Sequence, residues 1–528
     1  MNLRLGLHHH IAGTRYSVPC TAAVALLVAF AAVNVFAQQD RNVPEVKLAR
    51  GGTPSLPIVA GSVKEPADEL QRYLSRMVGK EFLFAQGRQK DGAIYVGLES
   101  DFPWEEFETG EGRRERFQRV VNEKKNEVYI VAKHPLGVQH GVTSLLRELG
   151  CRWFFPGETW EVIPENRKEL VVSGNDFQSP SFPTQRRIWY GFGAYGPCKE
   201  DWEVWVRHNR MGGPLQVGIG HSWAGLHAEK DFQTNPQWFA LVDGKRQPSK
   251  PCYSHPEVIA KAKAAALELA ERGDAMISMT PPDGLGYCEC EKCLAAAGVR
   301  ETFEAHSSLF GKRTDGTLVN VTSETVFGMA NEVAKAVAAK YPDTLVGCYA
   351  YSAYSHPPSF KLHPNVYLQT TTAYRRTPLS LEEQVSAFGD KTDQLGIREY
   401  YSVYQWDWDY PDPGKMTPDV LKQDLSQFHH WGVTAVNAEA SNNWAARGLG
   451  YYVAARLLWD VDADTQKIVK DFYEQAFGPA ARPMERYYAR WYGPSVAVFT
   501  DPSELPQRVK YFEKGKHNPA ALRDAYAD

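Results

Sequence analysis

Strand and helix patterns alternate along residues 184–460, and this alternation constrains the fold more than any other feature of the sequence. Each unit joins a short apolar run to an amphipathic helical pattern. Eight such units in about 280 residues are typical of a (β/α)8 TIM-type barrel, which we therefore expect here. A Rossmann fold is disfavoured because no glycine-rich phosphate-binding fingerprint opens any of the helices. The expected strands are RRIWYGFG, PLQVGIG, QWFALVD, AMISMTP, TLVGCYAY, NVYLQTT, IREYYSVY and TAVNAEAS.

A smaller α/β pattern covers residues 45–178, before the expected barrel. It contains the amphipathic helical pattern PADELQRYLSRMVGK and the buried-strand patterns AIYVGL and NEVYIVAK. We interpret this region as an accessory domain. The chain after the barrel carries the helical pattern TQKIVKDFYEQAFGPAARPMERYYARWY, so we expect residues 461–528 to form a helical carboxyl-terminal extension.

The first residues have the features of a targeting segment. Arg4 and Arg15 precede the apolar run TAAVALLVAFAAV, and Ala37 offers a small-residue cleavage site. The apolar run is too short to span a bilayer comfortably. We interpret residues 1–37 as a signal peptide, and we expect a periplasmic or secreted protein with no membrane association after cleavage.

Charge and aromatic content narrow the classes of partner. The formal net charge is -4 and no basic run is present, so we expect no nucleic-acid partner. The chain has 14 Trp, 26 Tyr and 24 Phe residues, which serve as stacking platforms in sugar-binding clefts but also fill large cores. A carbohydrate ligand therefore agrees with the composition without being required by it.

Carboxylates lie near the carboxyl ends of several expected strands, where TIM barrels carry their functional groups. Asp283 follows AMISMTP, Glu399 lies in IREYYSVY, and Glu439 lies near the end of TAVNAEAS. Glycoside hydrolysis uses such carboxyl groups, one to protonate the leaving oxygen and another to stabilise the anomeric centre. Glu439 is our first candidate for the acid, because it lies between two alanines where burial would raise its pKa. Glu399 is the second, unless it forms a structural ion pair with Arg398, and Asp283 is the expected polariser or substrate binder.

Aromatic, amide and histidine side chains accompany these acids at the expected strand ends. Rings stack on the C–H faces of sugars, and Asn, Asp and His side chains bind hydroxyl groups. The candidate substrate-binding residues are His221, Trp223, Tyr351, Tyr374, Trp406, Asp407, Asn442, Asn443 and Trp444.

A cysteine cluster follows Asp283 in the stretch MTPPDGLGYCECEKC. Cys288, Cys290 and Cys293, together with Cys252, would supply four thiolates for a structural zinc site. The expected oxidising compartment favours disulfide bonds instead. Both alternatives describe a structural staple, and the sequence leaves zinc and disulfide open, whereas a catalytic thiol is disfavoured because no Cys–His pairing stands out.

Several stretches, taken together, resemble a known family. RHNRMGG, KPCYSHPEV, MTPPDGLGYCECEKC, REYYSVYQWDWDY and AEASNNWAARGLGYYVAARLLWD resemble bacterial proteins that carry the domain of unknown function 4838, part of which forms glycoside hydrolase family 163. PADELQRYLSRMVGKEF, AIYVGLES and GVQHGVTSLLRELGCRWFFPGETWEVIP resemble the accessory domain of α-glucuronidases and β-hexosaminidases. The resemblance implies an endo-β-N-acetylglucosaminidase-like glycosidase that acts on N-glycans, with retaining, substrate-assisted catalysis that requires no cofactor.

Two alternatives remain open at this point. One is an α-glucuronidase-like exo-glycosidase on plant polysaccharide, whose uronate would need a cationic clamp such as Arg375, Arg376 or Arg447. The other is a non-catalytic glycan-binding protein with a degenerate barrel. Two carboxyl groups about 5–10 Å apart at the barrel mouth would favour catalysis over binding.

Overall fold

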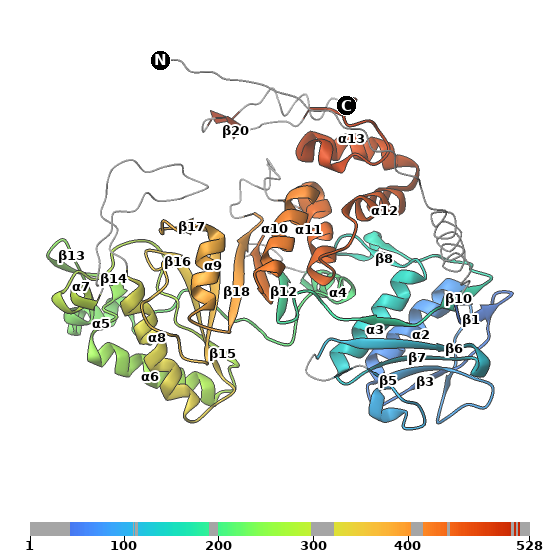
Figure 1. Ribbon diagram of the computed structural model, residues 1–528, viewed down its shortest axis with the longest axis horizontal. Coiled ribbons are helices and arrows are strands. Elements are labelled where there is room, and N and C mark those ends of the chain that lie inside the picture. The colour runs from blue at the N-terminus through green and yellow to red at the C-terminus, as the bar shows by residue number, and fades with distance from the viewer. Residues whose placement is uncertain are drawn as a thin grey trace, which may run out of the picture.

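The structure, a computed structural model, combines an amino-terminal α/β unit, a curled parallel sheet with its helices, and a helical carboxyl-terminal segment (Figure 1). The amino-terminal unit, blue to cyan in Figure 1, lies to one side of the parallel sheet. In the part of the chain that is described, no helix combines the length and apolar character needed to cross a membrane. The described residues are 43–108, 110, 114–189, 199–296, 322–402, 416–440, 444–507, 512–513 and 516–517.

The amino-terminal unit is a mixed six-stranded sheet with two helices. Its elements are β3 (Ile58–Ala60), α2 (Lys64–Val78), β4 (Phe84–Ala85), β5 (Ile94–Leu98), β6 (Phe117–Asn122), β7 (Glu127–Ala132), α3 (Pro135–Glu148) and β11 (Asp176–Gln178). The strand order is β11-β6-β7-β5-β3-β4, and β7 is buried along its whole length. The expected amphipathic helix is confirmed, since α2 buries Leu70, Tyr73, Leu74 and Met77 and ends at Gly79 with φ +78°.

Shorter strands complete this region. A second sheet, in the order β10-β1-β2, lies beside the first, and two further strands form a small antiparallel pair. Their bounds are β1 (Glu45–Arg50), β2 (Thr53–Pro54), β8 (Arg152–Trp153), β9 (Glu161–Val162) and β10 (Leu170–Ser173).

Six strands of the central region form one sheet in which every pair is parallel. They are β12 (Gln185–Ile188), β15 (Met276–Ser278), β16 (Leu345–Ser352), β17 (Val366–Arg375), β18 (Leu395–Tyr400) and β19 (Ala435–Glu439). The order is β12-β19-β18-β17-β16-β15. Because successive strands are parallel, their carboxyl ends meet at one rim, which we call the mouth. The helices of this region are α4 (Lys199–His208), α5 (Ala228–Thr234), α6 (Pro256–Glu271), α7 (Glu291–Ala296), α8 (Ser323–Ala338), α9 (Leu381–Gly389), α10 (Pro418–His430) and α11 (Trp444–Trp459).

Two of the eight expected barrel strands differ from the prediction. QWFALVD forms β13 (Phe239–Val242), which pairs with β14 (Lys245–Pro251) as an antiparallel hairpin outside the parallel sheet. The turn residues Asp243 and Gly244 have φ of +48° and +73°, as a two-residue type I′ turn requires. PLQVGIG forms no strand, so the described residues make a curled parallel half-barrel rather than eight regular strands.

The segment that contains PLQVGIG nevertheless contacts both edges of the curled sheet. Gly212 and Arg186 exchange backbone hydrogen bonds of 2.6 and 2.7 Å at the β12 edge. At the other edge, the Ser222 amide donates to the Thr280 carbonyl at 2.7 Å. Between these points, Val217 packs in an apolar cluster with residues of β15, β17 and β19. The segment thus lies between the two edges of the sheet, in the place of a seventh strand, without regular strand structure.

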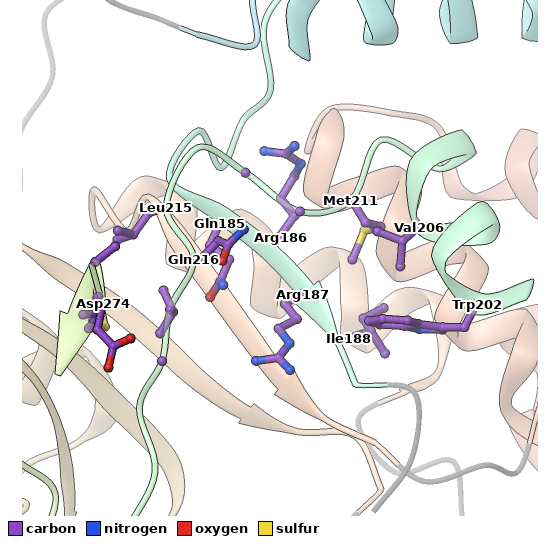
Figure 2. Close-up of a pocket in the computed structure, with 16 residues that line it drawn as sticks. Gln185, Arg186, Arg187, Ile188, Trp202, Val206, Met211, Leu215, Gln216 and Asp274 are labelled. Atoms are coloured by element: carbon purple, nitrogen blue, oxygen red, sulfur yellow. The ribbon is translucent and has the colours of Figure 1, made fainter. Parts of the chain in front are cut away.

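A cavity of 600 Å³ accompanies this irregular segment. Its lining combines β12 residues such as Gln185, segment residues such as Leu215 and Gln216, and Asp274 just before β15 (Figure 2). The cavity therefore lies in the gap where an eighth regular strand would close the barrel. It is a consequence of the incomplete sheet, and we assign no substrate to it.

Helices cover the outer face of the curled sheet. α6 and α8 pack on β15 and β16, while α10 and α11 pack with the last two helices in the largest apolar cluster. These last helices are α12 (Thr465–Phe477) and α13 (Ala481–Tyr492), followed by the strand pair β20 (Phe512–Glu513) and β21 (Lys516–His517). The prediction of a helical carboxyl-terminal segment is confirmed by α12 and α13.

A buried ion pair joins the amino-terminal unit to the parallel sheet. Arg186 of β12 donates two hydrogen bonds to Glu115, one of them 2.8 Å long from Nη1 to Oε2. His140 of α3 lies 3.0 Å from the same carboxylate, and all three side chains are buried. The two units therefore share a polar contact that is closed to solvent.

Candidate functional site

The strand register decides which side chains face the interior of the curled sheet. Arg398 is paired with Asn437, and Tyr400 with Glu439, across β18 and β19. Residues paired in this way point to the same face, and side chains alternate along each strand. The face that carries Glu439 is therefore the face that also carries Arg398 and Tyr400.

Glu439 is the buried carboxyl group at the mouth. Its side chain is 8% exposed, and it accepts a hydrogen bond from Nη2 of Arg398. Burial raises the pKa of Glu439 above its ordinary value, the charge and hydrogen bond of Arg398 oppose this change, and the negative charge of Asp283 adds to it. The net direction is upward, so Glu439 loses its proton at a higher pH than an ordinary glutamate.

Arg398 is surrounded by aromatic rings. Its guanidinium carbon lies 4.1 Å from the ring centre of Trp189, 5.4 Å from that of Tyr400 and 5.6 Å from that of Tyr349. Contacts of this kind stabilise a cation in a site with little water. Among the described residues, Nη1 of Arg398 is buried and has no hydrogen-bond partner. The mouth thus holds a cation with one unused donor.

Asp283 lies in the loop after β15 and is the exposed carboxylate of the mouth. Its side chain is 64% exposed, and its Oδ1 accepts a hydrogen bond of 3.1 Å from the Tyr351 hydroxyl. Nε2 of His221 is 4.0 Å from the same oxygen, while Nδ1 donates to the Pro281 carbonyl at 2.6 Å. The same oxygen also accepts a hydrogen bond of 2.7 Å from the Gly284 amide, so the carboxylate has two donors and a neighbouring imidazole, and it still faces solvent.

An aromatic wall connects Asp283 to Glu439. The ring centres of His221 and Tyr351 are 6.2 Å apart, those of Tyr351 and Tyr374 are 6.0 Å apart, and those of Tyr374 and Tyr400 are 5.4 Å apart. Tyr374 has φ +56° and Ser352 has φ +50°, a backbone conformation that is uncommon for residues other than glycine. Such strained positions cluster at functional sites, which agrees with a role for this wall.

Glu399 faces away from this group of residues. It pairs in register with Ala438, so it points to the face opposite to that of Arg398 and Tyr400. Its carboxylate accepts hydrogen bonds from Thr372 Oγ1 at 2.5 Å and from the Tyr400 amide at 2.7 Å. The geometry brings Glu439 and Asp283 to one mouth and leaves Glu399 behind the sheet.

The two candidate tryptophans in the described residues take part in packing. Trp444 begins α11 and forms edge-to-face contacts with Trp205 and Tyr451, each with ring centres 4.9 Å apart. Trp223 is half-buried against the apolar cluster of α6 and α8. Four further candidates, Trp406, Asp407, Asn442 and Asn443, lie outside the described residues.

The expected cationic clamp also differs from the cation found at the mouth. Arg375 donates to the Leu379 carbonyl at 3.1 Å and to Gln384 at 2.8 Å, while Arg447 donates to the Tyr401 carbonyl at 2.8 Å. Arg398, considered from the sequence only as a partner of Glu399, is the one that reaches Glu439. The sequence REYY could have identified Arg398, because side chains alternate between the two faces of a strand and neighbouring residues such as Arg398 and Glu399 therefore point to opposite faces.

The cysteine cluster forms one compact group. The sulfur atoms of Cys252, Cys288, Cys290 and Cys293 lie within 4.8 Å of one another, and no disulfide joins the cysteines of the described residues. The cluster borders the hairpin β13–β14 rather than the mouth itself. Of the residues that the structure describes, these four are suited to hold a metal ion.

Comparisons with solved structures concern the fold. The GH115 4-O-methyl-α-glucuronidase BtGH115A, which has specificity for decorated arabinogalactans, matches with TM-score 0.54 and 13% identity over 87% of this chain and 65% of that one. The GH89 protein CpGH89 from Clostridium perfringens matches with TM-score 0.45 and 9% identity over 88% of this chain and 57% of that one. The GH20 β-N-acetylhexosaminidase from Streptomyces coelicolor A3(2) matches with TM-score 0.39 and 14% identity, covering 88% and 96%. The chain thus spans less than two thirds of BtGH115A and of CpGH89.

Comparisons of sequence give the family. No curated protein matches the chain. The family model described as domain of unknown function (DUF4838) matches residues 155–490, which include the whole parallel sheet, Glu439, Asp283 and the cysteine cluster. Since this match covers more than half of the chain, the protein belongs to the DUF4838 family.

Proposed function

We propose that the protein is a glycoside hydrolase in which Glu439 is the general acid. The observation that carries this proposal is a buried carboxyl group with a raised pKa, at the carboxyl end of β19 and within the electrostatic reach of a second carboxylate, Asp283. A carboxyl group that holds its proton can deliver it to a leaving oxygen. The likeness of the fold to BtGH115A supports the same class of activity.

Asp283 is the polariser in this proposal. An N-acetylglucosamine unit in the mouth would present its 2-acetamido group to Asp283, whose position is supported by the Tyr351 hydroxyl and by His221. The acetamide oxygen would attack the anomeric carbon while Asp283 accepts a hydrogen bond from the acetamide N–H. Glu439 would protonate the departing oxygen, and it would then take a proton from the water that opens the cyclic intermediate. This sequence retains the anomeric configuration and requires no cofactor.

The substrate class is N-acetylglucosamine-containing glycans, with an endo-β-N-acetylglucosaminidase-like action on N-glycans. The aromatic wall of Tyr351, Tyr374 and Tyr400 offers ring faces and edges beside the two carboxyl groups. Sugar C–H faces bind to such rings, and the tyrosine hydroxyls can bond to sugar hydroxyls. We expect the bound sugar to lie along this wall.

A second candidate is an α-glucuronidase-like exo-glycosidase, and one observation favours it. Nη1 of Arg398 is buried and has no partner among the described residues, and a substrate carboxylate would accept its hydrogen bond. The same fold is found in BtGH115A, an α-glucuronidase. In this alternative, Arg398 binds the uronate, and Glu439 keeps the role of acid.

The test is a substrate screen with the mature chain and its Glu439→Gln variant. N-glycans, chitooligosaccharides and glucuronoxylan are incubated with each protein, and the products are identified by mass spectrometry, with the first-formed anomer identified by NMR. Release of N-acetylglucosamine-ended products with retention, lost in Glu439→Gln, is the expected result. Release of a uronic acid would favour the second candidate. Binding of glycans without turnover by the unaltered chain would overturn both and leave a glycan-binding protein.

A further inference from the structure

The four-cysteine cluster joins two segments that are distant in sequence. Cys252 follows the last residue of β14, whereas Cys288, Cys290 and Cys293 lie between the Asp283 loop and α7. Three of the four are buried, and Cys290 is half-buried. The cluster therefore ties the hairpin β13–β14 to the segment that carries Asp283.

The distances from one sulfur atom to two of the others match those of a tetrahedral metal site. Cys252 Sγ is 3.8 Å from Cys290 Sγ and 3.7 Å from Cys293 Sγ. A zinc ion with four Zn–S bonds of about 2.3 Å holds its sulfur atoms about 3.8 Å apart, the edge of a regular tetrahedron. A disulfide requires about 2.05 Å between bonded sulfur atoms and joins them only in pairs. Two contacts of almost equal length from one sulfur fit a shared ion better than a pairwise bond.

Hydrogen-bond donors surround the cluster. The Leu241 amide donates to Cys288 Sγ at 3.4 Å, and Arg246 Nη1 lies 3.7 Å from the same sulfur. Ser254 Oγ is 2.9 Å from Cys293 Sγ. Donors in this position stabilise the negative charge of metal-bound thiolates and orient them.

The apolar group in direct contact with the cysteines is small, whereas the neighbouring Phe239 of β13 packs in the larger cluster of α6 and α8. The cysteines pack with Ala240, Leu241 and Val242, and the nearby helices α5 and α7 have only seven and six residues. Short elements of this kind are commonly held by a metal or by disulfides. Four cysteine ligands would fill the coordination shell of a zinc ion, so a metal here would be closed to substrate and structural.

We propose that Cys252, Cys288, Cys290 and Cys293 bind one structural zinc ion, which fixes the Asp283 loop to the hairpin. A second contact also joins the hairpin to the Asp283 loop. Lys250 of β14 donates hydrogen bonds to the carbonyl oxygens of Pro282 and Asp283, the latter at 2.9 Å. The zinc and Lys250 thus hold the loop from both of its ends. The proposed metal site does not depend on the glycosidase proposal. Only the statement that a fixed Asp283 loop serves catalysis rests on the proposed function.

The site is tested on the mature chain, without the expected signal peptide and otherwise whole, purified without chelator. We expect one zinc per chain by elemental analysis, an intact mass without disulfides, and the charge-transfer absorption of a tetrahedral thiolate site after exchange for cobalt. Cys290→Ser is expected to lose the zinc, whereas the control Cys348→Ala, from β16 outside the cluster, is expected to keep it. Three results would overturn the zinc site: a chain without metal, a chain with a different metal, or a mass lowered by disulfides within the cluster. Each is measured on the unaltered protein.

The fixing of the loop is tested by hydrogen exchange, which does not depend on any activity. Removal of zinc is expected to raise amide exchange in residues 281–293 and in β13–β14, while β5 and β7 of the amino-terminal unit keep their protection. Unchanged exchange of residues 281–293 without zinc would refute the role in holding Asp283. Loss of activity with intact exchange would instead concern the glycosidase proposal.

Discussion

Arg398 donates a hydrogen bond to Glu439 across neighbouring strands, and yet the pKa of Glu439 stays above its ordinary value. Burial is the largest cause, and the nearby charge of Asp283 adds to it, so Arg398 does not compensate fully. The arrangement makes this carboxyl group harder to ionise than an ordinary glutamate, although a cation stands close by. Each of the three groups can be removed separately, and the directions of the resulting changes differ.

Glu439→Gln is expected to lower kcat/KM by about 10²- to 10⁴-fold, the usual contribution of a general acid. In the unaltered protein, activity falls as the pH rises through the raised pKa of Glu439, because the acid loses its proton. The variant has no such group, so its residual activity is expected to lack this alkaline limb. A pH profile of kcat/KM measures both effects, with Glu382→Gln on the exposed side of α9 as control. An alkaline limb that persists in Glu439→Gln would assign it to another residue.

Asp283→Asn is expected to shift the alkaline limb to lower pH. The Asp283 charge raises the pKa of Glu439, so its removal lets Glu439 ionise at a lower pH. If Asp283 also polarises the substrate, kcat decreases as well, even at the new optimum. Asp343→Asn is the matched control. Asp343 lies in the exposed turn before β16, at the end of that strand opposite to the mouth. A limb that does not move would show that the two carboxyl groups are not coupled.

Arg398→Met is expected to shift the same limb in the opposite direction, to higher pH. The Arg398 charge and hydrogen bond lower the pKa of Glu439, so without them burial raises it further. Arg398→Lys keeps the charge but loses the planar pair of donors, and an intermediate shift is expected. If the substrate is a uronide, Arg398→Met also raises KM, whereas a neutral amino sugar leaves KM less affected. A shift to lower pH would contradict the assigned electrostatics.

Much of the fold was predictable because its signals are local. The helical periodicity that predicted α2, α12 and α13 depends only on residues within one turn or two of each other. QWFALVD was predicted to be a barrel strand because its apolar run is indistinguishable from a buried parallel strand. Asp243, the last residue of this stretch, and the following Gly244 were the opposing signal, since this dipeptide favours a hairpin turn.

The candidate site was predictable only in part. Asp283, Glu399 and Glu439 were all predicted because they lie near strand ends. The face of the sheet to which each side chain points, however, depends on alternation within each strand and on the register between strands. The register of β18 with β19 separates Glu399 from Glu439. The packing of Trp444 against Trp205 involves helices more than 200 residues apart in sequence. No local pattern encodes such a contact, which is why an aromatic ring near a strand end was a weak guide.

Glu115→Gln is expected to destabilise the junction between the amino-terminal unit and the parallel sheet by about 3–5 kcal/mol, since it leaves Arg186 buried without a counter-charge. Burial raises the pKa of Glu115, but Arg186 and the hydrogen bond with His140 lower it more, to about 2 from the ordinary 4.5. The stabilisation is therefore present above pH 4.5 and is lost as the pH falls toward 2. Urea unfolding at a series of pH values measures it.

The difference in free energy of unfolding between Glu115→Gln and the unaltered chain should therefore be largest near neutral pH and should narrow as the solution is acidified. Glu169→Gln is the control, because Glu169 pairs with Lys47 on the exposed surface, and its replacement should leave the free energy of unfolding unchanged. A deficit in Glu115→Gln that stays constant from neutral pH to pH 3 would mean that lost packing, and not the ion pair with Arg186, stabilises the junction.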